Sequence, residues 1–229
     1  MPKIKMARKS TIVDMTAMCD VAFLLLTFFM LATKFKKNEP VMVKTPSSIS
    51  QITVPDTSIM LITVDNRDRI FFSIDRKNVP TYNNNEARLA LINGIDQYKG
   101  LGLTNNDKVE FQNGASVGQP FSRLKQYLSA TVDQQHVMDA APDAGIPVDT
   151  SADAPNNELA QWIRVARNSN PYLRICIKGD VNTKYPAIDK IISTLGGMKI
   201  FRFNFITDLE QVPPGTPAYI LAQEAKTKK

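Results

Sequence analysis

The pattern of hydrophobic and polar positions divides the chain into two parts. One is a continuous apolar run near the N-terminus, and the other is a longer part in which shorter apolar stretches alternate with polar ones. The run IVDMTAMCDVAFLLLTFFMLAT covers residues 12–33. As a helix it would be about 33 Å long, enough to cross the roughly 30 Å hydrocarbon core of a bilayer. Residues 34–56 are polar and carry three prolines, which predicts an extended linker. Within it, Val41–Val43 could add a strand to a neighbour.

Residues 57–210 alternate between apolar stretches of strand length and of helix length, which predicts a small α+β domain with a mixed sheet and helices on one face. Predicted strands cover 58–64, 70–74, 172–177 and 202–206, with a turn at 65–68. Predicted helices cover 84–95, 121–132, 158–168 and 185–198, the last capped by Gly196 and Gly197. Predicted loops cover 100–118 and the flexible, acidic stretch 140–157, and residues 211–229 are a predicted tail. Trp162 is expected to be a core residue.

Three explanations compete for the apolar run. A signal peptide fits the basic residues before it, but Met30 and Ala32 make a poor cleavage site. A buried helix of a soluble protein would need cover all round, because residues 23–31 are apolar on every face except at Thr27. A transmembrane helix that contains a functional acid is the interpretation that helix geometry favours.

At about 100° per residue, Thr16, Asp20 and Thr27 fall within about 40° of one another and form one polar stripe. Asp14 lies off this stripe, nearer the membrane edge, where it can reach water. A carboxylate at mid-helix costs about 2.5–3.5 kcal/mol to insert, and such residues usually serve ion or proton movement. The alternative role for Asp20 is a polar contact that only joins two helices.

The net charge of +6 comes partly from basic clusters on both sides of the apolar run and at the C-terminus. This placement indicates a membrane rather than nucleic acid, and no nucleic-acid-binding motif is recognisable. We expect residues 1–11 in the cytoplasm, a single-pass span at 12–33, and the large C-terminal part in the periplasm.

Candidate chemistry outside the run is sparse. No hydrolase, metalloprotease or nucleotide-binding motif is recognisable, so we expect no enzyme and no cofactor other than protons. The two cysteines, Cys19 and Cys176, are not expected to pair, and His136 is expected to be a solvated side chain rather than a metal ligand. Asp180 and Asp189 are expected to be solvated charges, Asp180 in a turn after a strand.

The run from Asp14 to Met30, DMTAMCDVAFLLLTFFM, resembles the signature of the ExbD/TolR family, D-M-T-P-(M/L)-(I/V)-D-V-x-F-x-L-L-x-F-F-M. Ala17 and Cys19 depart from it. The sequence LRICIKGD at 173–180 and the segments after it resemble the family's later strand, turn, helix and closing strand. Residues 59–74 resemble its first hairpin. Residues 100–157 have no recognisable counterpart, and we expect this insertion to be accessory.

The resemblance implies a subunit of an inner-membrane motor driven by the proton motive force, with Asp20 as the essential transmembrane carboxylate. It also implies pairing with a second copy of the chain, ExbB/TolQ-like channel subunits, and a TonB-like partner for outer-membrane transport. A TolR-like role in envelope integrity stays open. So do a membrane-anchored module that binds peptidoglycan or a protein, and a secreted solute-binding protein if the run is a cleaved signal.

Overall fold

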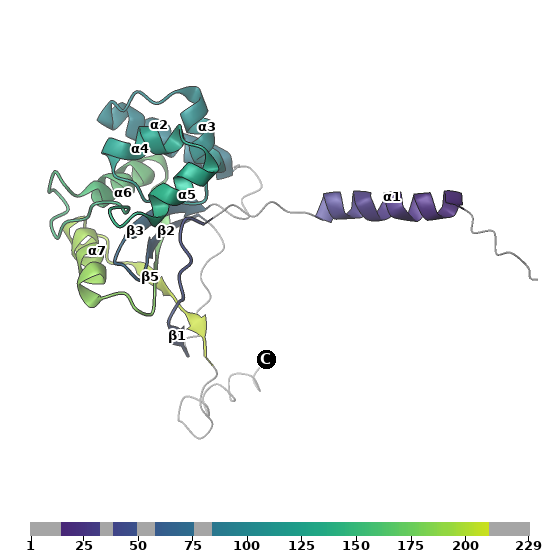
Figure 1. Cartoon of the computed structure of the whole chain (residues 1–229). Helices are drawn as coiled ribbons and strands as arrows, with labels where there is room; N and C mark the ends of the chain where they lie inside the picture. The colour runs from purple at the N-terminus through teal and green to yellow at the C-terminus, as the bar shows by residue number, and fades with distance from the viewer. Residues whose placement is uncertain (1–14, 33–38, 50–57, 76–83, 211–229) are drawn as a thin grey trace, which may run out of the picture. The chain divides into compact units, whose positions relative to one another are not determined.

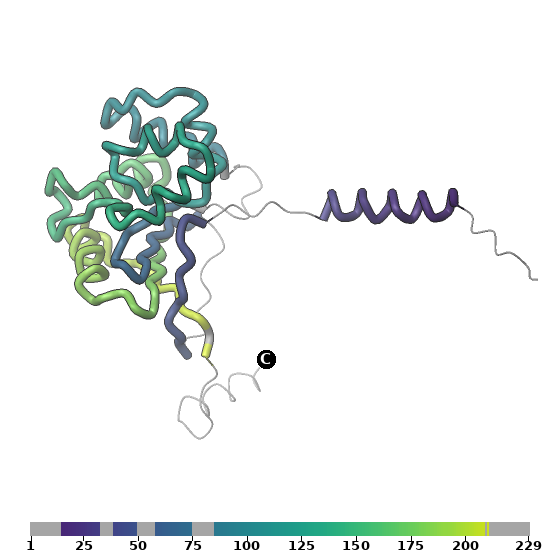
Figure 2. Tube along the Cα trace, viewed as in Figure 1, coloured from purple at the N-terminus to yellow at the C-terminus, as the bar shows by residue number. Residues whose placement is uncertain are grey.

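The computed structural model describes residues 15–32, 39–49, 58–75 and 84–210 (Figures 1 and 2). The chain divides into two compact units, Met1–Lys36 and Lys37–Lys229, here called the N-terminal and C-terminal units. In the N-terminal unit the described residues form a single helix, α1 (Met15–Ala32). The predicted ends of the apolar run, residues 12–14 and 33, lie outside the described residues.

A four-stranded mixed sheet organises the C-terminal unit, in the order β3-β2-β4-β5. Strand β2 (Ile59–Val64) runs antiparallel to β3 (Ile70–Asp75) and parallel to β4 (Arg174–Gly179), and β4 runs parallel to β5 (Phe203–Ile206). The predicted hairpin, the last two strands and their parallel pairing are confirmed. A second, two-stranded sheet pairs β1 (Ser47–Ser48) with β6 (Asp208–Leu209) in parallel.

The helices cover one face of the four-stranded sheet. Alternate residues of β2, Met60, Ile62 and Val64, are fully buried in one hydrophobic cluster with side chains of α2 (Asn84–Lys99), α6 (Glu158–Ser169) and α7 (Tyr185–Gly197). The period of two in β2 thus sets which face is covered. The predicted fold class, with helices on one face of a mixed sheet, is confirmed.

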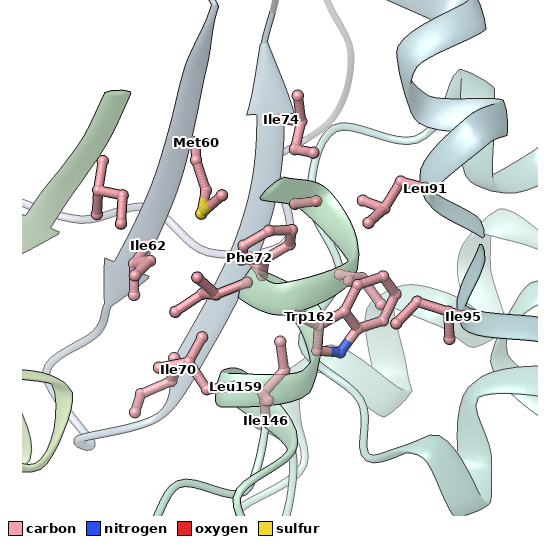
Figure 3. Packing of buried hydrophobic residues seen from close by; sticks show 14 of the residues in the cluster. Met60, Ile62, Ile70, Phe72, Ile74, Leu91, Ile95, Ile146, Leu159 and Trp162 are labelled. Atoms are coloured by element: carbon pink, nitrogen blue, oxygen red, sulfur yellow. The ribbon is translucent and has the colours of Figure 1, made fainter. Parts of the chain in front are cut away.

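Trp162 of α6 lies at the centre of the cluster, as predicted, and none of its surface is exposed (Figure 3). Its ring stacks on Phe72 of β3 and on Phe111, with centroids 5.6 and 5.9 Å away, and a third ring, Phe121, lies at 5.4 Å. Two of these three rings come from the stretch between residues 100 and 157.

The insertion therefore shares the common core and is not a separate appendage. It forms α3 (Asn105–Asn113), α4 (Phe121–Leu128) and α5 (Val132–Ala140). The predicted loop at 100–118 is wrong, because Thr104 and Asp107 form a capping box that starts α3 and Phe111 anchors it. The predicted helix at 121–132 ends at Leu128, and Thr131 caps a new helix.

The stretch 140–157 is irregular, as predicted, but it is built into the core rather than being a free acidic loop. Ile146 is buried and its N–H donates to the carbonyl of Ile70, 2.8 Å away. Asn157 is completely buried and donates to the carbonyls of Asp149 and Ser151, while its own side-chain oxygen caps α6 at the N–H of Ala160. These bonds hold the stretch against α6.

The end of α7 differs from the predicted glycine cap. Gly196 and Gly197 are the last helical residues, and the left-handed residue is Lys199, with φ 58°. The N–H of Lys199 donates to Gly196 and that of Ile200 to Leu195, which is a Schellman motif. Gly197 has a packing role, because a Cβ there would meet the Cβ of Ala152 at 2.9 Å.

Candidate functional site

Helix α1 is an apolar helix with one charge. Its 18 residues span about 27 Å and have a mean hydropathy of 2.0, which is long and apolar enough to cross a membrane. Its helical conformation follows from a stretch without proline or glycine that is rich in leucine, methionine and alanine. Asp20 is the single charged residue between Met15 and Ala32.

No residue of α1 is buried against the rest of the described chain. Large side chains such as Phe23, Leu26 and Phe29 keep 63%, 59% and 64% of their surface exposed. Soluble monomers rarely expose so large a continuous apolar surface, and such a surface usually contacts lipid or another protein. Helix α1 fits a single-pass membrane anchor.

The polar residues of α1 fall on one side of a regular helix, as the spacing predicts. Thr16, Asp20 and Thr27 are separated by four and seven residues, so their Cα–Cβ bonds point within about 40° of one another. The Thr27 hydroxyl donates to the carbonyl of Leu24, 3.0 Å away, which satisfies it within its own helix. Asp14 lies outside the described residues.

A carboxyl group on an apolar helix has definite chemistry. The charged form is stabilised by water or by a cationic partner, and the neutral form by apolar surroundings. A change in what faces Asp20 would therefore change its protonation. The role of Asp20 stays a prediction.

The segment that follows α1 is docked on the C-terminal unit over residues 39–49. The Lys44 N–H donates to the Asp180 carboxylate at 2.9 Å, and the Lys44 carbonyl accepts from Val181. The Asp180 pKa is lowered by the N–H groups of Asn182 and Lys44. Asp180 lies in a turn after β4, as predicted, but it also ties this segment to the end of the sheet.

Two further bonds fix the same segment at β6. Thr45 donates its hydroxyl to Asp208 at 2.5 Å, and Ser47 donates to Glu210 at 2.8 Å. Within the chain, Val41–Val43 form no strand, and the short strand lies at Ser47–Ser48, paired with β6. Addition of Val41–Val43 to a strand of another molecule stays a prediction. These contacts were not expected from sequence, because the side chains that make them are 136–163 residues apart.

The other candidate residues lie apart from one another. Cys19 is exposed on α1, and Cys176 is buried in β4, where burial raises the pKa of its thiol. His136 is exposed on α5, as predicted. Among the described residues, no group of three or more His, Cys, Asp or Glu side chains could hold a metal ion.

Comparison with known proteins gives one match. The family described as biopolymer transport protein ExbD/TolR matches residues 7–210, which include α1 and all the described strands and helices of the C-terminal unit. No curated protein and no solved structure matches the chain.

Proposed function

Because the chain belongs to the ExbD/TolR family of biopolymer transport proteins, we propose that it is an ExbD-like subunit of an inner-membrane motor that energises TonB-dependent outer-membrane transport. The observation that carries the proposal is Asp20, the one charged residue of an apolar helix that nothing in the described chain covers. Asp20 takes up and releases the protons whose flow drives the motor. The protein needs no other cofactor and catalyses no covalent reaction.

The proposed topology places residues 1–11 in the cytoplasm, α1 in the inner membrane and the C-terminal unit in the periplasm. Four lysine and arginine residues precede α1 and three follow it, so the positive-inside rule favours a cytoplasmic N-terminal side only slightly. Family membership implies association with ExbB/TolQ-type channel subunits and a TonB/TolA-type protein. A second copy of the chain would pair within the channel.

Insertion energetics support a partner for Asp20. An unpartnered mid-helix aspartate costs about 2.5–3.5 kcal/mol on insertion scales, and this cost falls when the residue faces a wet cavity or another helix. A channel subunit that surrounds α1 supplies both an apolar seal and a water-filled path. Protonation of Asp20 in the seal and ionisation in the path give two states of α1 that proton supply can bias.

The docked segment offers the route by which α1 would act on the C-terminal unit. Residues 39–49 are held at two places, by Asp180 after β4 and by Asp208 and Glu210 at β6. A movement of α1 that pulls on this segment would therefore reach the end of the sheet. Release of the segment from Asp180 would loosen that coupling without altering α1.

The test is Asp20→Asn in cells, with uptake through an energised outer-membrane transporter as the readout. Asn keeps a hydrogen-bonding group of the same shape and removes the titratable proton. We expect uptake to be lost while protein level and co-purification of channel subunits persist. Asp20→Glu should retain part of the activity. Cys19→Ser is the matched control, because Cys19 is exposed on the same helix next to Asp20 but lies off the polar stripe.

The other outcomes identify the alternatives. Normal uptake with Asp20→Asn would make Asp20 an interhelical contact and favour a membrane-anchored module that binds peptidoglycan or a protein. Normal uptake together with detergent sensitivity in Asp20→Asn cells would indicate the TolR-like role in envelope integrity. A mature N-terminus that begins after Ala32 would show a cleaved signal and support a secreted binding protein.

A further inference from the structure

A cavity of about 250 Å³ opens among the helices of the insertion. Its walls come from α2, α3, α4, α5, the segment that links α3 to α4, and Pro40. Aromatic and aliphatic side chains, among them Phe111, Val117 and Leu128, make the apolar part of the lining, and Arg88, His136 and Asp139 belong to the polar part. Pockets for drug-sized ligands measure roughly 300–1,000 Å³, so this cavity suits a smaller molecule.

A fixed cation forms one part of the wall. Arg88 of α2 is 3% exposed. Its Nε and one terminal nitrogen donate to the carbonyl of Phe111 at 3.1 and 2.7 Å, and the other terminal nitrogen donates to the carbonyl of Ala115 at 3.1 Å. Its guanidinium carbon lies 4.8 Å from the centroid of the Phe111 ring. The position of this positive charge is therefore set before any ligand arrives.

A fixed carboxyl group forms another part. Asp139 of α5 is also 3% exposed, and its two oxygens accept hydrogen bonds from Tyr127 at 2.9 Å and from Gln119 at 3.3 Å. Burial raises the Asp139 pKa, against the effect of these two bonds and of the nearby His136 and Arg69. A cationic group brought into the cavity would favour the ionised form of Asp139.

We propose that this cavity binds a small zwitterion of the amino-acid class. The ligand's carboxylate would be drawn to Arg88, its ammonium group to Asp139, and its apolar side chain to the lining at Leu128 and Val132. Arg88 and Asp139 are two buried, immobilised side chains of opposite charge in one small cavity, and they match a ligand that carries both charges and little else. Glu110 also lines the cavity and adds a second carboxylate to its anionic part. The cavity volume limits that ligand to a free amino acid or a compact dipeptide.

A purely structural role explains only part of this arrangement. The bonds of Asp139 to Tyr127 and Gln119 would hold α5 against the rest of the insertion with or without a cavity. The bonds of Arg88 to the carbonyls of Phe111 and Ala115 likewise tie α2 to the end of α3. Neither structural role requires that the two side chains of opposite charge line one open space. The site lies in the C-terminal unit, and none of its lining residues belongs to α1.

His136 allows a direct binding measurement, because it is the only histidine in the chain and lines the cavity. The full chain in nanodiscs, labelled with ¹⁵N-histidine, would give one imidazole spectrum. Leucine is the first probe, followed by a panel of free amino acids. Isoamylamine and 4-methylpentanoate carry the same apolar group with only one charge each. We expect leucine to shift the His136 signals saturably, and each single-charge analogue to bind at least tenfold more weakly.

Two variants separate binding from folding. Asp139→Asn removes the anionic partner and should weaken leucine binding at least tenfold. Val132→Trp places a large side chain at the cavity from a position that is 52% exposed, so the fold should tolerate it and binding should be lost. Val137→Trp is the matched control on the same helix, 72% exposed and outside the cavity lining, and should bind normally.

The proposal is overturned if no amino acid in the panel gives a saturable shift. If isoamylamine binds as tightly as leucine, the ligand's carboxylate is not recognised. The proposal of a zwitterion site is then wrong, and the cavity is a site for simple organic cations. Normal binding by Val132→Trp would place the ligand elsewhere.

Discussion

Helix α1 and the core of the C-terminal unit have similar apolar side chains in opposite situations. Every residue of α1 lacks cover within the described chain, whereas Met60, Ile62 and Trp162 are fully buried by neighbours from the same chain. The C-terminal unit therefore holds the information for its own fold. Helix α1 fits a single-pass membrane anchor, and our proposal assigns its surroundings to lipid and partner subunits.

This difference predicts where mutations act. Changes in the core should alter the free energy of unfolding of the isolated chain. Changes at Asp20 should leave that free energy almost unaffected and alter only the function of the assembled complex. Each prediction below tests one side of this comparison.

The largest effect is expected from removal of the insertion. A glycine–serine linker in place of residues 105–140 would delete α3–α5 and take Phe111 and Phe121 away from Trp162. We expect the C-terminal unit to lose its cooperative unfolding transition in urea, followed by circular dichroism. A cooperative transition close to that of the wild type would instead show that the insertion is accessory, as the sequence led us to expect.

Trp162→Ala should cost about 3–5 kcal/mol of unfolding free energy, because it leaves a large cavity between three aromatic rings. Urea denaturation followed by circular dichroism measures it, since the variant lacks the only tryptophan. Tyr172→Ala is the control, with 85% of its side chain exposed and an expected change within about 0.5 kcal/mol. If Trp162→Ala lowers the unfolding free energy by less than about 1 kcal/mol, Trp162 is not packed between the three aromatic rings as described.

Asn157→Ala should cost about 2 kcal/mol of unfolding free energy, because it removes the N-cap of α6 and the donor of three further hydrogen bonds, one of them to the buried hydroxyl of Thr194. The neighbouring Asn156→Ala is the matched control, because Asn156 is exposed and does not cap the helix. The same urea measurement applies to both. Equal stability of the two variants would show that the stretch 140–157 is not held by Asn157.

The smallest effect is the pH dependence contributed by Asp139. Its pKa is raised by burial, so the folded chain binds this proton more tightly than the unfolded chain. The resulting stabilisation is present at low pH and is lost as the pH rises from about 3.8 through the folded pKa. The unfolding free energy of the wild type minus that of Asp139→Asn should therefore fall as the pH rises from about 4 to about 8. If this free-energy difference stays constant or rises with pH, the pKa of Asp139 is not raised in the folded chain.

The parts of the fold that sequence predicted are those with strong periodicity. The β2–β3 hairpin follows from the Ile, Thr and Val content of IMLITV and from the turn at 65–68, and α6 follows from the spacing of Leu159, Trp162 and Ile163. Helix α3 was missed because NNDKVEFQN is mostly polar. The pair Thr104 and Asp107, three residues apart, was the local signal that could have found it.

Long-range contacts were beyond sequence reasoning. Nothing local indicates that Asn157 bonds to Thr194, or that Lys44 meets Asp180, since such contacts depend on the finished packing. The left-handed Lys199 in place of a glycine is a similar case, because the Schellman bonds of α7 override the local preference. For Asp20, the sequence predicted the helix and its polar stripe, while the role of the acid stays a prediction.

The most direct test of the central claim is proton flux through the purified complex. The full chain would be purified with its co-isolated channel subunits, reconstituted into liposomes that contain a pH-sensitive dye, and energised by a potassium gradient with valinomycin. We expect the wild-type complex to acidify the lumen and the Asp20→Asn complex, assembled to the same extent, to be close to the level of empty liposomes. Equal flux through both complexes would contradict the role of Asp20 as the proton-carrying residue.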